Sequence, residues 1–171
     1  MTTDLTSETT ENRAVTNPKV TLVEQPKSYE MPNDALFVPV DDIPWTPIPG
    51  WPGSYTKLLS FDIQSGRTTT LFKMDPGARL PVHKHFSSVD IYVVKGTFGY
   101  GDQYVTAPGF VYEPTGVIHE PIAAEGEIIL FAVAYGPTQT FWEDGRPGPV
   151  GDVGGRVDLV VANGAAAHLG L

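Results

Sequence analysis

Residues 76–96, PGARLPVHKHFSSVDIYVVKG, combine a turn, a pair of histidines and a strand within one short segment. The Pro-Gly pair at its start favours a turn, and the β-branched and aromatic run VDIYVVK predicts a strand that ends at Gly96. Residues two apart in an extended segment point to the same face. His83 and His85 are therefore predicted to project side by side just before that strand.

The rest of the chain repeats this pattern of short strands and turns. GRTTTLFKM (66–74) alternates in part, and a Gly-Asp turn separates TFGY (97–100) from QYVTA (103–107), as in a hairpin. GFVYE (109–113) predicts another strand, and GEIILFAVAY (126–135) is apolar on both faces, which is typical of a strand in the middle of a sandwich or barrel. With 18 glycines, 16 prolines and no pattern for a helix of core length, we predict an all-β jelly roll.

Three parts of the chain differ in composition. Residues 1–33 are rich in Thr, Glu and Asn and predict a flexible N-terminal arm. Residues 34–152 are predicted to form a single domain, because a chain of 171 residues is long enough for one core. Residues 153–171 are predicted to be a C-terminal tail, in which VVANGAAAHLGL (160–171) is compatible with a short helix.

The composition excludes several classes of function. The chain has no cysteine, which rules out disulfides and thiolate metal sites. Its net charge is −9 and its 11 basic residues are scattered, so it lacks the positive stripe that nucleic acids and anionic membranes require. Because no apolar stretch is typical of a signal sequence or a membrane helix, we expect a cytoplasmic protein without a membrane partner.

A third histidine, His119, ends the segment EPTGVIH (113–119), whose proline and glycine favour a tight turn. The intervening strands can lead it back to the first pair, and three imidazole nitrogens can bind one metal ion at about 2.0–2.2 Å each. We therefore predict a metal site formed by His83, His85 and His119. The remaining coordination positions of the metal ion would be open to water, oxygen or substrate, as in catalytic rather than structural metal sites. His168 lies in a Gly/Ala-rich tail and is predicted to be structural.

These segments also resemble a known superfamily. GARLPVHKH (77–85), closed by Gly96, resembles the first cupin motif, and GFVYEPTGVIH (109–119) resembles the second. From about residue 34 to residue 152 the chain is similar to the 2,4′-dihydroxyacetophenone dioxygenase group of cupins, which is in turn similar to the acetylacetone-cleaving dioxygenases. The resemblance implies a single cupin jelly-roll barrel with an extended N-terminal arm, and a homodimer or a larger assembly.

The resemblance also bears on the metal and the reaction. Most cupins place a glutamate ligand shortly after the HxH pair, but here that position is Val89, and the neighbouring Asp90 is predicted to face the other way. An all-histidine triad holding Fe(II) is what the resemblance implies for this group. Three neutral ligands leave the ion its full charge, which favours binding of a deprotonated diketone or hydroxyketone.

The implied reaction is cleavage by O2 of a carbon–carbon bond next to a carbonyl, in a small aryl hydroxyketone or diketone. The resemblance places an acidic residue at Glu113, near the metal but not on it. Such a carboxylate is a candidate catalytic group, because it can orient a ligand imidazole or accept a proton from the substrate.

Two alternatives stay open. Zinc, manganese or nickel at the three histidines would make the protein an isomerase, lyase or hydrolase that uses no oxygen. Related cupin domains also occur in anti-sigma regulators, which suggests a non-enzymatic metal-bound sensor, although residues 1–33 carry no pattern for a sigma-binding helix. In any of these cases the pocket is expected to contain aromatic side chains. The candidates are Phe72, Tyr92, Tyr100, Phe110 and Phe131.

Overall fold

The computed structural model describes residues 36–123 and 125–171, so the predicted arm at 1–33 lies outside the described residues. The helical elements are η1 (Val40–Asp42), α1 (Val153–Ala162) and η2 (Ala167–Leu169). None of the helices in this part of the chain is long and apolar enough to cross a membrane. The strands are β1 (Thr46–Pro47), β2 (Ser54–Asp62), β3 (Arg67–Met74), β4 (His83–His85), β5 (Val89–Lys95), β6 (Thr97–Tyr100), β7 (Gln103–Thr106), β8 (Gly109–Glu113), β9 (Ile118–His119), β10 (Ile128–Ala134), β11 (Thr138–Phe141) and β12 (Pro147–Gly151).

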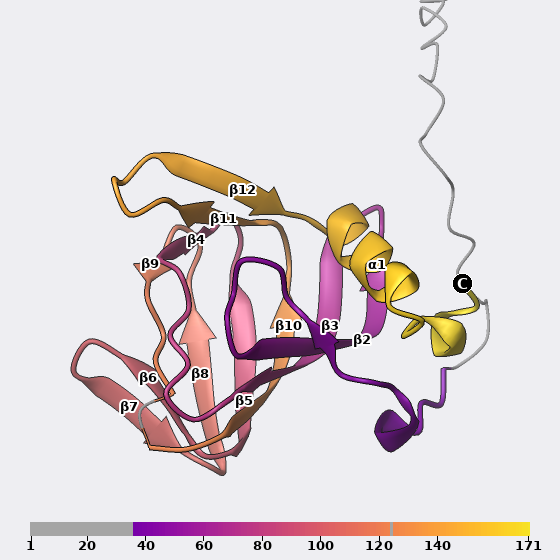
Figure 1. Ribbon diagram of the computed structural model, residues 1–171, viewed down its shortest axis with the longest axis horizontal. Coiled ribbons are helices and arrows are strands. Elements are labelled where there is room, and N and C mark those ends of the chain that lie inside the picture. Colours follow the sequence, from indigo (N-terminus) through magenta and orange to yellow (C-terminus); the bar gives the residue numbers. More distant parts are fainter. Residues whose placement is uncertain (1–35, 124) are drawn as a thin grey trace, which may run out of the picture.

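Antiparallel sheets build a jelly roll (Figure 1). The larger sheet has the strand order β1-β2-β3-β10-β5-β8, the smaller one has the order β12-β11-β4-β9, and β6 and β7 form the predicted hairpin. Strands that are distant in sequence become neighbours, since β10 pairs with β3 on one side and with β5 on the other. The predicted all-β jelly roll is therefore confirmed.

Alternation along each strand decides which side chains enter the barrel. In β5, Val89, Ile91 and Val93 are buried, whereas Tyr92, between them, is exposed. The buried residues of β5 belong to one core cluster with residues of β3, β6 and β10. This cluster forms the apolar core of the barrel.

Gly96 ends β5 because the chain turns there against another segment. Its φ is +80°, and a Cβ at this position would collide with the backbone carbonyl oxygen of Glu127. Only glycine adopts this left-handed conformation without strain and leaves room for that oxygen. The strand end predicted at Gly96 is confirmed.

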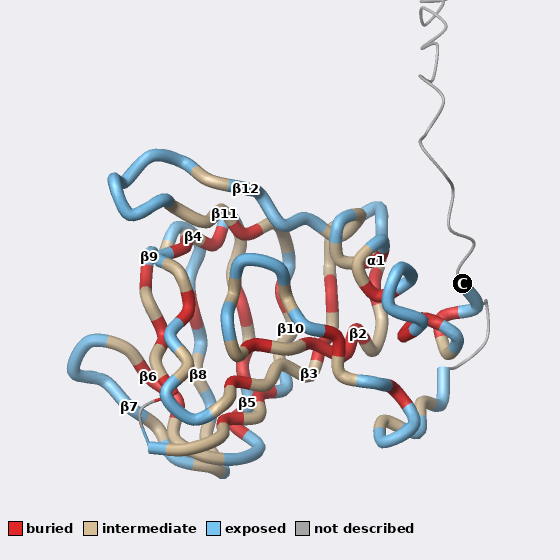
Figure 2. Tube along the Cα trace, in the orientation of Figure 1, coloured by how far each residue is buried: buried red, intermediate tan, exposed pale blue. Residues whose placement is uncertain are grey.

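Helix α1 packs on β2 and forms part of a second core (Figure 2). Asp152 caps the helix, since its Oδ1 accepts the N–H of Gly155 at 2.8 Å. This cap starts the helix earlier than the predicted stretch at 160–171, which is only partly helical. Residues one turn apart on the helix join residues of β2 in this cluster, which contains Leu58, Phe61, Val157 and Val160.

The outward face of the larger sheet exposes a row of aromatic side chains. Phe131, Tyr92 and Phe110 are register partners on β10, β5 and β8, and their exposed fractions are 37%, 48% and 62%. The prediction that these three residues line the pocket is wrong, because alternation along each strand turns them away from the interior.

Candidate metal centre

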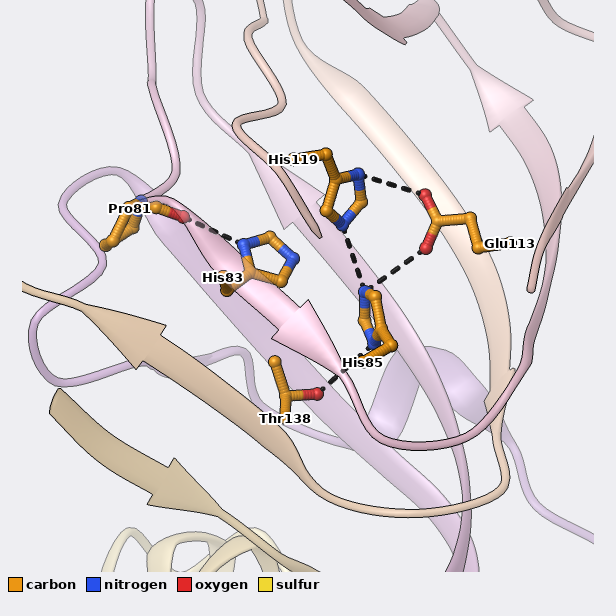
Figure 3. A network of polar contacts seen from close by, with 6 residues as sticks. All are labelled: Pro81, His83, His85, Glu113, His119 and Thr138. Carbon is orange, nitrogen blue, oxygen red and sulfur yellow. Dashed lines mark hydrogen bonds and ion pairs between the residues drawn. The ribbon is translucent and has the colours of Figure 1, made fainter. Parts of the chain in front are cut away.

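The short strand β4 lies between β9 and β11 in the smaller sheet. Its pairing with β9 sets His83 opposite His119, and its pairing with β11 sets His85 opposite Thr138. Both histidines of β4 are buried, because residues two apart share a face, whereas Lys84 between them is only half-buried. Two adjacent strands therefore bring the three predicted histidines together (Figure 3).

The three imidazole rings converge on one point. One ring nitrogen of each histidine lies within 4.8 Å of the other two. The Nε2 atoms of His85 and His119 are 3.0 Å apart. Two nitrogens that each lie about 2.1 Å from one metal at a right angle are about 3.0 Å apart. This pair thus already has the separation that a shared ion requires.

Contacts at the far side of each ring orient the histidines. Nδ1 of His83 lies 2.8 Å from the carbonyl oxygen of Pro81 and must donate to it, which leaves the lone pair of His83 on Nε2. Nδ1 of His85 lies 3.4 Å from the hydroxyl of Thr138. Outer partners of this kind fix the tautomer and the ring orientation of metal-binding histidines.

Burial keeps the imidazoles in the form that binds metal. Burial is the main reason that the pKa of His83 falls to about 4 and the pKa of His119 falls to about 3, and repulsion from neighbouring histidines contributes to both shifts. Both rings are therefore neutral at physiological pH. A metal ion binds the neutral imidazole, so it would not have to displace protons from these two ligands.

Glu113 is a buried carboxylate beside the triad, with an exposed fraction of 1%. Its Oε2 lies 3.2 Å from Nε2 of His85, and its Oε1 lies 3.3 Å from Nδ1 of His119 (Figure 3). Neither oxygen has a well-formed hydrogen bond. A buried carboxylate without a donor is costly, and a nearby cation relieves that cost. The orphaned carboxylate and the neutral nitrogen set together fit a divalent metal ion.

Aromatic rings pack against two of the histidines. The ring of Trp51 lies 5.0 Å from that of His83, and the ring of Tyr100 lies 4.4 Å from that of His119, edge to face. Burial and the charge of Glu113 raise the pKa of Tyr100 to about 12, so its hydroxyl stays protonated. Trp51 was not among the aromatic residues predicted to line the pocket. The only sign in the sequence is that it lies between two Pro-Gly pairs, which predict a loop.

A cavity of about 1000 Å³ opens onto the triad. Ligand pockets reach about this size. Its wall includes both sheets, the loop before β2 and helix α1. Phe72 lines it as predicted, and Tyr100 lies beside it through its contact with His119. Most of the wall is apolar, with contributions from Trp51, Phe72, Leu80, Val89, Ile91 and Phe98.

Two further sequence candidates lie away from this centre. Asp90 faces outward and accepts a hydrogen bond from the hydroxyl of Tyr135 at 3.2 Å, in agreement with the predicted orientation. His168 lies 2.7 Å from the carbonyl oxygen of Leu58 and donates to it from Nε2. This bond ties the end of the chain to β2, which agrees with the structural role predicted for His168.

The sequence and the geometry agree with one family. Residues 33–139 match the ChrR cupin-like domain family, and the chain belongs to it. A comparison with curated protein sequences finds no match. Among solved structures, the chain is similar to an RmlC-like cupin protein of Ralstonia eutropha, with a TM-score of 0.70 and 25% identity, over 82% of this chain and 91% of that one.

Two similar structures have named activities. One is an acetylacetone dioxygenase of Acinetobacter johnsonii, with a TM-score of 0.67 and 15% identity over 82% of this chain and 99% of that one. The other is the polyketide cyclase RemF of Streptomyces resistomycificus, with a TM-score of 0.53 and 20% identity over 70% of this chain and 86% of that one. At these identities the likeness is one of fold. The predicted resemblance to cupins is confirmed.

The metal-free protein is expected to lose stability as the pH falls from about 6.5 toward 4. Below about 6.5 the unfolded chain binds protons that the folded His83 and His119 do not. The free energy of unfolding should therefore fall by about 1.4 kcal/mol per pH unit for each of the two histidines. Urea titrations at neutral and at mildly acidic pH measure this loss.

The control is the double variant His83→Asn/His119→Asn, which lacks both groups and should show a much smaller loss. Equal losses in the variant and in the unchanged protein would contradict this account.

Proposed function

We propose that this protein is a mononuclear non-haem iron dioxygenase that cleaves a carbon–carbon bond next to a carbonyl in a small aryl hydroxyketone or diketone. The observation that carries the proposal is the convergence of three buried histidines on the wall of a large apolar cavity. The similarity in fold to an acetylacetone dioxygenase is in keeping with this reaction class.

His83, His85 and His119 would hold the metal, each through the nitrogen that faces the other two. When bound, iron supplies the redox chemistry through which oxygen reacts with an organic substrate. The three ligands are neutral and the nearby Glu113 carboxylate offsets only one of the ion's two charges, so the site favours a substrate that is an anion when it binds. The apolar cavity wall contributes by keeping water away from that substrate.

Glu113 would accept the proton that the substrate loses. A diketone becomes an enolate by giving up a proton from the carbon between its carbonyls, and a general base must lie within reach of that proton. Glu113 lies next to two of the three predicted ligands, and neither of its oxygens has a well-formed hydrogen bond. Its Oε1 also faces Nδ1 of His119, so the same carboxylate can hold that ring in place.

Replacing any one of His83, His85 and His119 with Ala is expected to abolish metal retention. The unchanged protein should bind about one metal ion per chain, because its three nitrogens form a single site. Elemental analysis of the purified variants measures the loss. His168→Ala is the matched control and should keep the metal, because His168 bonds to a backbone carbonyl away from the centre. Full retention in all three site variants would rule out this ligand set.

The iron-loaded protein is expected to consume oxygen when an aryl hydroxyketone or a β-diketone is added. An oxygen electrode, with products identified by mass spectrometry, measures the reaction across a panel of such compounds. The zinc-loaded protein is the control and should not consume oxygen, because zinc has no redox chemistry. Turnover by the zinc-loaded protein under argon would instead favour the isomerase, lyase or hydrolase that we consider as the alternative.

Glu113→Gln is expected to keep the metal but to lower the rate of turnover by about 10²- to 10⁴-fold, because an amide of the same size cannot accept the proton. Steady-state kinetics and metal content should be measured on the same preparation. Glu127→Gln serves as the control, since Glu127 forms an ion pair with Lys95 on the surface. An unchanged rate in Glu113→Gln would remove Glu113 from the mechanism.

A cytoplasmic location and a homodimer or larger assembly stay predictions. The exposed row of Phe131, Tyr92 and Phe110 is the observation that favours self-association, because aromatic side chains are enriched where proteins pack together.

A further inference from the structure

Helix α1 forms one wall of the cavity that opens onto the triad. Gly155, Arg156 and Leu159 line the cavity, and residues spaced three or four apart lie on one side of a helix. Val157 and Val160, on a neighbouring side, are fully buried. This packing anchors the helix, so the side that carries Arg156 is held toward the cavity.

Arg156 brings a positive charge into this wall without a partner. It is half-buried, and its guanidinium makes no hydrogen bond and no ion pair with any residue in the described part of the chain. The nearby Asp152 uses its Oδ1 to cap α1 at Gly155 and makes no ion pair with Arg156. Burial lowers the pKa of Arg156, and the charge of Asp152 opposes that effect.

Arg79, the other arginine on the cavity wall, does have a partner of opposite charge. Arg79 forms an ion pair with Glu120 at 2.9 Å, and both side chains are well exposed. Among the described residues that line the cavity, Arg156 is therefore the guanidinium without a carboxylate partner. Five N–H groups in a fixed plane match the two oxygens of a carboxylate.

Arg156 also lies near the candidate metal centre. Arg156 lines the same cavity as His83, His85 and His119, and its charge makes a small contribution to the low pKa of His83. A bound metal ion would add a second positive charge to the same cavity. The Glu113 carboxylate in the same cavity offsets only part of this positive charge, so an anionic ligand between the metal and Arg156 would lower the remaining repulsion.

We propose that Arg156 binds a carboxylate of the substrate, so that the substrate class is a diketone or hydroxyketone that also carries a carboxylate group. The metal centre would take the carbonyl oxygens, the apolar wall would cover the carbon skeleton, and Arg156 would hold the acid end. The part of this inference that concerns the carbonyl group rests on the proposed function, whereas the recognition of a carboxylate by Arg156 does not.

The test compares acids with their neutral esters. The probes are benzoylpyruvate and 4-acetoacetylbenzoate, which place a carboxylate next to the diketone or across the aromatic ring, and the methyl ester of each. Dissociation constants are measured on the full chain loaded with zinc under argon, so that no oxygen chemistry takes place. Trp51 lines the cavity, and quenching of tryptophan fluorescence reports binding.

At least one acid is expected to bind about 10- to 100-fold more tightly than its ester, which is the range of a charge-assisted hydrogen-bonded pair. In Arg156→Gln this preference should disappear because the acid binds more weakly, while the affinity for the ester stays the same. Arg156→Lys should keep part of the preference, because it keeps the charge but loses the planar fork. Arg79→Gln is the matched control and should keep all of it.

Arg156→Gln is expected to fold normally, because it removes a charge that has no partner, and a urea titration checks this. The inference is overturned if neither acid is preferred by the unchanged protein, or if the preference survives in Arg156→Gln. These outcomes are distinct from a failure of the proposed function. If iron-loaded protein consumes no oxygen while the preference for the acid persists, the dioxygenase proposal falls and the role of Arg156 stands.

Discussion

The pairing of β4 with β9 sets the relative positions of the three histidines in the candidate metal centre. It places His83 opposite His119 on adjacent strands, and β11 on the other side of β4 holds the pair in the sheet. A slip of one residue would turn the side chains of β4 to the opposite face.

Backbone hydrogen bonds at both ends prevent such a slip. The N–H of Gly116 donates to the carbonyl of His85 at 2.8 Å, and the N–H of Leu80 donates to the carbonyl of Pro121 at 3.0 Å. A strand of three residues is thus held by contacts that extend well beyond it.

The carboxylate near the triad comes from a neighbouring strand. Val89 occupies the place where most cupins carry a glutamate, and its register partner on β8 is Glu113. Both positions face the interior at the same level of the sheet, so a carboxylate is present there even though β5 lacks one. From β8, Glu113 lies close to one nitrogen of His85 and one nitrogen of His119.

Much of this site could be predicted from the sequence, because paired histidines on a strand and alternating apolar residues are local patterns.

The parts of the site that could not be predicted from the sequence are those whose position depends on tertiary packing. Tyr92, Phe110 and Phe131 have the residue type of a pocket wall, but only the register of the strands decides which face they occupy. Trp51 comes from a loop, and Arg156 comes from a helix whose start depends on one capping aspartate. Neither position follows from periodicity, because loops and short helices are placed by the surfaces that they cover.

Helix α1 follows every strand of the described chain, whereas the three histidines come earlier. A chain emerges from the ribosome beginning with its N-terminal part. The strands that carry the triad are therefore made before the helix that covers Leu58 and Phe61, and the barrel lacks one wall until α1 packs. Until that moment the histidines are reached by a wider route than in the finished molecule.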